Sequence, residues 1–190
     1  MQSTFRSTIK TIAVKASTVI GAAVISVAVS GVAQACLNVA VPAHTMALSV
    51  RTLQSDLMVA GLSCNQRELY NGFAVRFRPP LRNHGTELRN YFTRLHGDGA
   101  NREINTYVTG LANYAAVRHA QDYDDYCGGT ERAFRALLVE NIEIERVAVA
   151  YAMRVSPSLQ QEITLASADA GCDVVDGTRV VAADGSSVLE

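Results

Sequence analysis

Four cysteines are the residues of this sequence whose chemistry can be predicted most directly. The chain of 190 residues holds Cys36, Cys64, Cys127 and Cys172. An even number of cysteines favours disulfides in an exported chain, and four cysteines allow three pairings. Cys64 and Cys127 each stand at a predicted helix boundary, where a loop can bring two Cα atoms within the ~4.4–6.8 Å that a disulfide needs. We expect these two to be bonded, with Cys36 and Cys172 either bonded to each other or left free or differently paired.

The histidines and cysteines lack the spacings of common redox and metal motifs. The sequence contains no Cys-x-x-Cys and no His-Glu-x-x-His, which argues against a thiol oxidoreductase motif and a helical zinc protease. His96 and Asp98 lie two residues apart, but no third potential metal ligand is near them in sequence. His119 approaches Cys127 in sequence, yet a cysteine held in a disulfide cannot act as a nucleophile. We therefore assign no catalytic residue, no metal site and no cofactor.

Arginines are concentrated in one part of the chain. Residues 65–102 hold seven arginines and three acidic residues, whereas residues 121–190 hold five arginines and 13 acidic residues. Arg78, Arg82 and Arg89 recur at intervals of four and seven residues and predict a basic helix face that could bind an anionic envelope polymer or a lipid phosphate. The alternative is a solvated face whose ion pairs contribute only about 0–1 kcal/mol each.

The first 35 residues predict a secretory signal peptide. Arg6, Lys10 and Lys15 precede an uncharged apolar run, and the run ends in the small-x-small sequence Ala33-Gln34-Ala35. We expect cleavage after Ala35, which places the mature protein in the periplasm or outside the cell. The alternative is an uncleaved membrane anchor, because residues 16–35 are about long enough to cross a bilayer.

Cleavage after residue 35 would change both the charge and the N-terminus of the chain. Removing three of the 17 basic residues leaves 14 against 18 acidic ones, a net charge of −4, and every remaining basic residue is arginine. Cys36 would then be the first residue. A lipid anchor on Cys36 is a second alternative, although Ala33 and Gln34 fit a lipoprotein signal poorly. We expect no stable membrane span once the signal is removed.

Helical periodicity runs through most of the remaining chain. Apolar residues recur at spacings of three and four in five segments, residues 46–62, 65–77, 79–95, 101–115 and 122–138. Pro79-Pro80 predicts the end of the second helix and the start of the third, and Gly97-Asp98-Gly99 predicts the end of the third. Asn65 and Asn101 are the expected N-caps of the second and fourth helices.

The last third of the sequence leaves alternatives open. The fifth helix begins either at Asp122 or, because Gly128-Gly129 weakens a helix, only at Thr130. Residues 141–155 alternate like a strand, but their alanines and length favour a helix. A short helix over residues 158–167 follows. From residue 168 the composition predicts either a small hairpin or a disordered tail.

The patterns together predict an all-α fold. We expect a small bundle of about five to six helices, stapled by a disulfide and followed by an irregular C-terminal tail. The expected divisions are a signal peptide over residues 1–35, a helical domain over residues 36–167 and a flexible or hairpin tail over residues 168–190.

Part of the sequence resembles a group of small exported bacterial proteins of unknown function. The likeness spans roughly residues 53–138 and lies in Leu53-Gln-Ser-Asp-Leu-Met-Val-Ala-Gly-Leu-Ser-Cys64, Tyr70-Asn71, Phe77, Leu88-Arg89-x-Tyr91-Phe92, Val108-Thr-x-Leu-Ala-Asn113 and Tyr126-Cys127. The resemblance implies export and the same Cys64–Cys127 pairing. It implies no catalytic residue, and it does not reach the fourth cysteine.

The sequence favours a binding or structural accessory protein of the cell envelope over an enzyme. It has no Gly-x-Ser-x-Gly elbow and no phosphate-binding loop. The expected partner is an envelope protein or an anionic envelope polymer, and nothing indicates nucleic acid. The alternative is an envelope enzyme or redox protein whose site is assembled from dispersed residues such as His96, His119 and Asp122.

Overall fold

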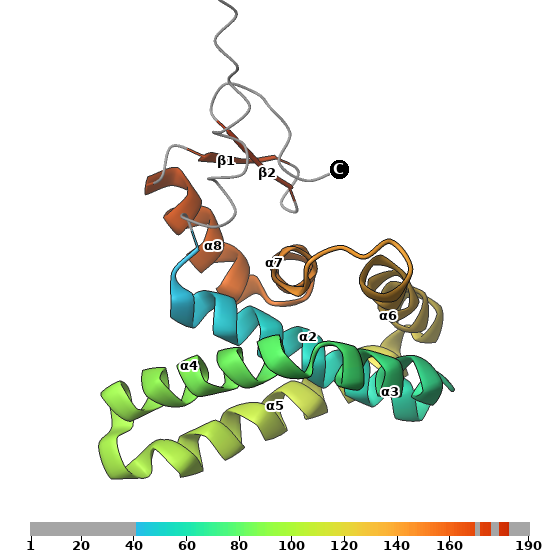
Figure 1. Ribbon diagram of the computed structural model, residues 1–190, viewed down its shortest axis with the longest axis horizontal. Helices are drawn as coiled ribbons and strands as arrows, with labels where there is room; N and C mark the ends of the chain where they lie inside the picture. The colour runs from blue at the N-terminus through green and yellow to red at the C-terminus, as the bar shows by residue number, and fades with distance from the viewer. Residues whose placement is uncertain (1–40, 170–171, 176–178, 183–190) are drawn as a thin grey trace, which may run out of the picture.

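Helix α2 (Ala43–Ser63) lies at the centre of the fold. The computed structural model describes residues 41–169, 172–175 and 179–182. Six helices contact α2: α3 (Arg67–Arg76), α4 (Arg78–His96), α5 (Ala100–Gln121), α6 (Tyr123–Leu138), α7 (Ile144–Val155) and α8 (Pro157–Asp169) (Figure 1). Leu48, Leu53 and Ala60 of α2 belong to three separate buried clusters. One helix therefore joins all three parts of the core.

Small polar residues allow α2 to be buried on all sides. Its buried polar side chains are Thr45, Ser49, Thr52, Ser55 and Asp56. The Ser49 hydroxyl donates to the Thr45 carbonyl at 2.8 Å, and the Thr52 hydroxyl donates to the Leu48 carbonyl at 3.0 Å. Ser49 and Thr52 therefore satisfy their hydroxyl protons within their own helix, whereas the Thr45 hydroxyl donates to Glu162 of α8.

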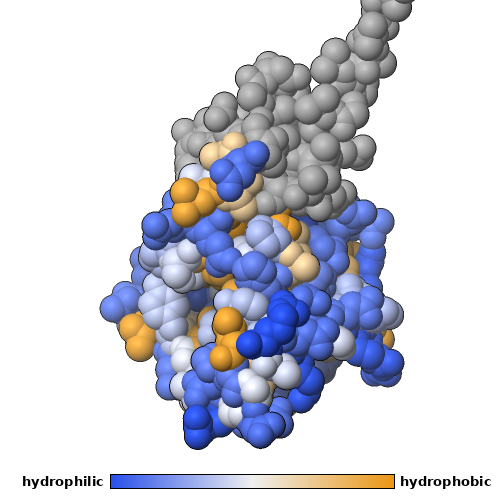
Figure 2. Space-filling view, turned by 90° about the vertical axis from the view of Figure 1, so that its left-hand side faces the viewer, coloured by the Kyte–Doolittle hydropathy of each residue, from blue (hydrophilic) through white to orange (hydrophobic). Residues whose placement is uncertain are grey.

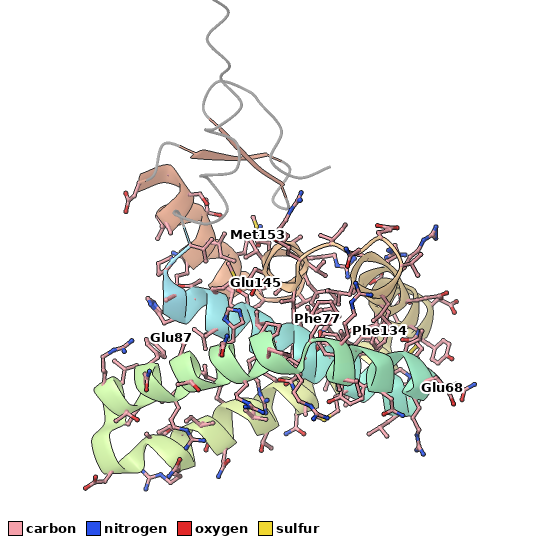
Figure 3. All side chains as sticks on the ribbon, in the orientation of Figure 1. Glu68, Phe77, Glu87, Phe134, Glu145 and Met153 are labelled. Atoms are coloured by element: carbon pink, nitrogen blue, oxygen red, sulfur yellow. A yellow bond between two sulfur atoms is a disulfide. The ribbon has the colours of Figure 1, made fainter. Side chains whose placement is uncertain are left out.

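The chain turns from α3 into α4 at a single buried aromatic residue. Phe77 follows the last residue of α3 and precedes the first residue of α4, and Pro79 sits in the first turn of α4, where its missing N–H is no loss. Phe77 and Phe134 of α6 lie in one buried cluster (Figure 3). The break predicted at Pro79-Pro80 is confirmed.

Helices α4 and α5 form a pair whose far end is poorly covered. They are joined by the short 3-10 helix η1 (Gly97–Gly99), and Gly97 has a φ of 52°, a conformation that favours glycine. Residues 93–98 are all exposed. This end of the pair reaches beyond the other helices in Figure 1, so we expect it to be the least protected part of the bundle.

Helix α6 begins at Tyr123 and runs through both glycines, so the alternative start at Thr130 is wrong. The Asp122 carboxylate accepts the backbone N–H of Asp125 at 2.9 Å and caps the helix. A Cβ atom on Gly129 would lie 3.0 Å from the Arg154 guanidinium of α7. The glycine therefore lowers local helix propensity and leaves room for the Arg154 side chain.

The sequence also left open whether residues 141–155 form a strand or a helix, and it predicted helix caps at Asn65 and Asn101. Most of residues 141–155 form helix α7 (Ile144–Val155), so the expected helix is confirmed. The predicted caps are wrong: Asn65 has a left-handed φ of 57°, which asparagine tolerates, and α5 already begins at Ala100. Asn101 lies inside α5, where its side-chain oxygen accepts from Arg89 at 3.0 Å.

Beyond α8, strands β1 (Cys172–Val175) and β2 (Arg179–Ala182) form an antiparallel pair in which Cys172 lies opposite Ala182. The predicted all-α bundle is confirmed for residues 41–169, and the strand pair lies in the segment predicted as a flexible or hairpin tail. The predicted signal peptide over residues 1–35 lies outside the described residues.

One hydrogen bond joins α4 to α7 and predicts an acid sensitivity. His84 Nε2 lies 2.9 Å from Glu145 Oε1 in the first turn of α7. This bond lowers the pKa of the Glu145 carboxyl, against the opposing effect of burial. A carboxyl with a lowered pKa stabilises the fold above its unfolded pKa of about 4.5, and the stabilisation is lost as the pH falls through the folded value.

We therefore expect wild-type protein to lose free energy of unfolding more steeply below pH about 4.5 than Glu145→Gln. Urea denaturation between neutral and acid pH measures the difference. Glu143→Gln, an exposed carboxylate two residues away, is the control and should behave like wild type. Equal acid slopes for wild type and Glu145→Gln would contradict the assignment.

Candidate functional site

A small cavity lies between α2, α4 and α5. Its volume is about 210 Å³. Its apolar wall is formed by Ala47, Val50, Leu81, Leu88 and Ile104. The basic side chains of Arg51, His84 and Arg89 also line it, together with Gln54, and no acidic residue does. The cavity thus combines an apolar wall with a basic one, and we refer to it as the α2–α4–α5 pocket.

Arg51 is the most unusual residue of the α2–α4–α5 pocket. It is half-buried, and its Nη1 donates to the Gln54 side-chain oxygen at 3.0 Å. Its Nε is buried and has no hydrogen-bond partner. Burial lowers the pKa of Arg51 below its ordinary value, and Tyr70 and Tyr107 oppose that shift. No carboxylate of the described chain forms an ion pair with it, so its charge is only weakly compensated.

The two basic α4 residues of the pocket, His84 and Arg89, bond to neighbours outside it. His84 is oriented by its bond to Glu145. Arg89 donates to the Asn101 side chain at 3.0 Å and, like Arg51, has no ion-pair partner among the described residues. The pocket therefore holds two arginines that form no ion pair with any carboxylate of the described residues. Charge of this kind favours an anion.

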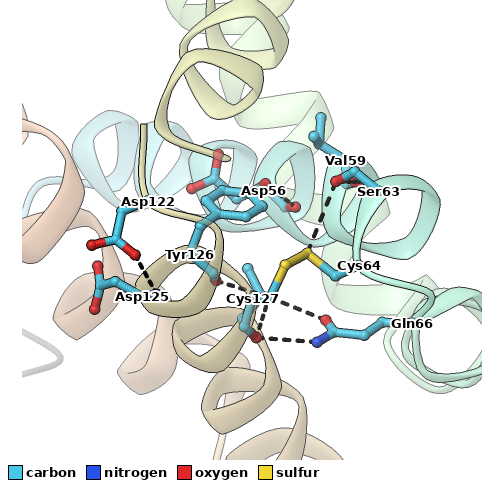
Figure 4. The surroundings of a disulfide bond; sticks show 10 residues. Asp56, Val59, Ser63, Cys64, Gln66, Asp122, Asp125, Tyr126 and Cys127 are labelled. Carbon is cyan, nitrogen blue, oxygen red and sulfur yellow. Dashed lines mark hydrogen bonds between the residues drawn. A yellow bond between two sulfur atoms is a disulfide. The ribbon is translucent and has the colours of Figure 1, made fainter. Parts of the chain in front are cut away.

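The predicted disulfide is present at the meeting point of α2, α5 and α6. Cys64 and Cys127 are bonded, with Cα atoms 5.6 Å apart (Figure 4). Gln66 braces the same place, because its Nε2 donates to the Cys127 carbonyl at 3.1 Å and its side-chain oxygen accepts from Thr130 at 3.1 Å. Cys36 lies outside the described residues, so the Cys36–Cys172 pairing stays a prediction.

Next to the disulfide lies a buried ion pair between Asp56 of α2 and Arg118 of α5. Asp56 is 2% exposed and contacts Arg118 directly. The Tyr126 hydroxyl donates to the Asp56 carbonyl at 2.9 Å, and Tyr151 hydrogen-bonds the Asp56 carboxylate. Burial raises the pKa of the Asp56 carboxyl, while Arg118 and Tyr151 oppose the rise. Arg118, Tyr126 and Tyr151 all bond to Asp56, although Arg118 Nε is buried without a partner. Because these residues come from α2, α5, α6 and α7, we interpret the group as a structural link between four helices.

The arginine face predicted from the sequence is only partly gathered into a site. Arg78, Arg82 and Arg89 are all exposed on α4. Arg89 alone of the three lines the pocket, where Arg51 from α2 joins it. Sequence reasoning missed Arg51 and His84. The only signal in the sequence was that Arg51 stands beside Val50, a residue of an apolar helical stripe. Such an arginine is expected to be solvated unless the helix is known to be buried on every side.

The histidines lie apart from one another with separate partners. His44 lies 2.9 Å from Glu162, and His84 lies 2.9 Å from Glu145. His96 is exposed and stacks on Phe92. His119 lies against Tyr126, beside the disulfide. None of the dispersed set His96, His119 and Asp122 lines the α2–α4–α5 pocket. Asp122 instead serves as the cap of α6.

Comparison of the chain with models of protein families, with curated proteins and with solved structures finds no match. The resemblance described from the sequence therefore stays a prediction. In the part of the chain that the structure describes, no helix combines the length and the apolar character that crossing a membrane requires.

The disulfide generates a stability prediction. Cys64→Ser and Cys127→Ser should each lower the free energy of unfolding by about 2–5 kcal/mol, because each removes the same cross-link. The double variant should lose little more than either single one. Chemical denaturation under non-reducing conditions measures all three.

Ser63→Ala is a suitable control, because Ser63 adjoins the bond and is exposed. It should change stability by less than about 0.5 kcal/mol. Losses in the two single cysteine variants that add up in the double variant would show that the two sulfurs act independently.

Proposed function

We propose that this protein is a binding protein of the periplasm or the cell exterior and that its α2–α4–α5 pocket holds a small anion with an apolar portion. The observation that supports the proposal most strongly is the pair Arg51 and Arg89. Both line a partly apolar cavity, and neither has a carboxylate partner among the described residues.

Electrostatics favours a carboxylate or phosphate group in the pocket. A hydrogen bond to a charged group contributes about 1.5–3 kcal/mol, more than a neutral one. The guanidinium of arginine can also bind two oxygens of such a group at once. Arg51 gains most from a ligand, because its buried Nε lacks any partner and a buried polar group without one is destabilising.

The size of the pocket limits the ligand. Drug-sized ligands occupy pockets of about 300–1,000 Å³, whereas this cavity measures about 210 Å³. A single small molecule fits this volume, with its apolar part against Val50, Leu88 and Ile104. A small aromatic or branched carboxylate has this chemistry. An anionic polymer would instead meet the exposed arginines of α4.

The surface and the sequence support a binding role outside the cytoplasm. The basic and apolar N-terminal segment favours export, and a disulfide persists best in an oxidising compartment. On the face shown in Figure 2, apolar residues lie in small groups among hydrophilic ones. That face therefore offers no broad apolar surface for a protein partner.

Titration with benzoate tests the proposal, with benzamide as a neutral analogue of the same shape and inorganic phosphate as an anion without an apolar part. Two-dimensional NMR of the wild-type protein should show benzoate shifting amides of α2, α4 and α5 around the pocket. Benzamide and phosphate should each bind at least about tenfold more weakly, a loss of roughly 1.4 kcal/mol.

Arg51→Gln should weaken benzoate binding by about 10–100-fold, because one charge-assisted hydrogen bond is lost. Arg67→Gln is the matched control, since Arg67 is an exposed arginine on α3 outside the pocket, and it should leave the affinity unchanged. Equal effects of the two substitutions, or binding of benzamide as tightly as benzoate, would overturn the proposal.

A further inference from the structure

The disulfide has a third potential metal ligand beside it. Ligand atoms of Cys64, Cys127 and His119 all lie within 4.8 Å of one another. Both cysteines are buried, and His119 is half-buried. The three residues come from the end of α2, the last turns of α5 and the first turns of α6. Two sulfurs and an imidazole nitrogen at this spacing are the ligands that zinc and similar thiophilic cations prefer.

His119 has a nitrogen that the folded protein leaves without a partner. Its Nε2 is buried and forms no hydrogen bond. The ring packs edge-on against Tyr123 and Tyr126, with centroids 5.2 and 5.6 Å away. Aromatic packing thus holds the ring in place, while nothing in the described structure uses its buried nitrogen. A buried polar atom without a partner requires an explanation. A metal ion that binds this nitrogen only when the disulfide is reduced would provide one.

We propose that reduction of the Cys64–Cys127 disulfide creates a zinc site formed by the two thiolates and the His119 imidazole. A dithiol reductant supplies two electrons and two protons: its own sulfurs become a disulfide, and the protein S–S bond becomes two thiols. Zinc binding then displaces the two thiol protons to solvent. The two thiolate charges balance the charge of the ion, and the fourth tetrahedral position is left to water or another ligand.

The geometry requires only a small adjustment. With Zn–S bonds of about 2.3 Å and tetrahedral angles, the two sulfurs must be roughly 3.8 Å apart. Side-chain rotation supplies this separation while the Cα atoms stay near 5.6 Å. Gln66 and the Asp56–Arg118 pair still join the three helices when the bond is open. The site is independent of the anion pocket and does not rest on its occupancy.

The test uses the full chain carrying Cys36→Ser and Cys172→Ser, so that Cys64 and Cys127 are the only thiols. After reduction and removal of the reductant without oxygen, zinc alone should bind with a stoichiometry of one in competition with a chromophoric chelator. Cobalt in place of zinc should give the charge-transfer absorption of thiolate ligands. The oxidised protein should bind neither metal at this site.

His119→Gln should weaken zinc binding by at least about 10–100-fold, the loss that follows even from removing a residue that only orients a ligand. His96→Gln, an exposed histidine elsewhere, should leave the affinity unchanged. Equal affinities of the two variants would overturn the proposal.

Thermal unfolding of the reduced chain, followed by its helical circular dichroism, separates binding from loss of the fold. Zinc should raise the unfolding midpoint of the reduced chain, because a ligand that binds the folded state stabilises it. It should have a much smaller effect on reduced His119→Gln. A reduced chain that stays unfolded in the presence of zinc would also overturn the proposal.

Discussion

The burial of α2 on all sides is the constraint on which the rest of the structure depends. A helix surrounded by others must either be apolar all round or satisfy its polar groups within the core. Helix α2 does the second. The Ser49 and Thr52 hydroxyls bond to carbonyls of α2, and the Thr45 hydroxyl donates to Glu162 of α8. The one buried carboxylate of α2, Asp56, is matched by Arg118 and Tyr151. These contacts join α2 to α5 and α7, and the Tyr126 hydroxyl joins α2 to α6 next to Cys127 of the disulfide.

Asp56 and Arg51, the aspartate and the arginine of α2, have different surroundings. Asp56 is buried and fully engaged in contacts that link four helices. Arg51, a little more than one turn earlier, is half-buried with a buried nitrogen that has no partner. Arg118 of α5 also has a buried Nε without a partner, but its guanidinium pairs with Asp56, whereas Arg51 pairs with no carboxylate of the described residues. This contrast within one helix separates a structural ion pair from a candidate binding residue, and it leads us to place the ligand site at Arg51.

The helical stripes were predictable because their signal is local. Spacings of three and four residues and the Pro79-Pro80 break follow from the geometry of a single helix. The cap predicted at Asn65 was wrong although it was a local prediction. The alternative start predicted at Thr130 was wrong where a contact between helices matters. Gly129 weakens α6 taken alone, yet a Cβ atom there would lie only 3.0 Å from the Arg154 guanidinium of α7. Arg51 could not be identified, because its significance arises only when α4 and α5 close over α2.

Native-state hydrogen exchange, measured amide by amide, tests the central position of α2 most directly. Backbone amides exchange either through local opening or through global unfolding, and the least exposed elements require the latter. We predict that the amides of residues 48–60 in α2 exchange only with the free energy of global unfolding, whereas those of residues 93–98 at the far end of α4 exchange at much lower free energy. Exchange of the α2 amides through an opening that costs less free energy than opening α6 or α7 would contradict the account.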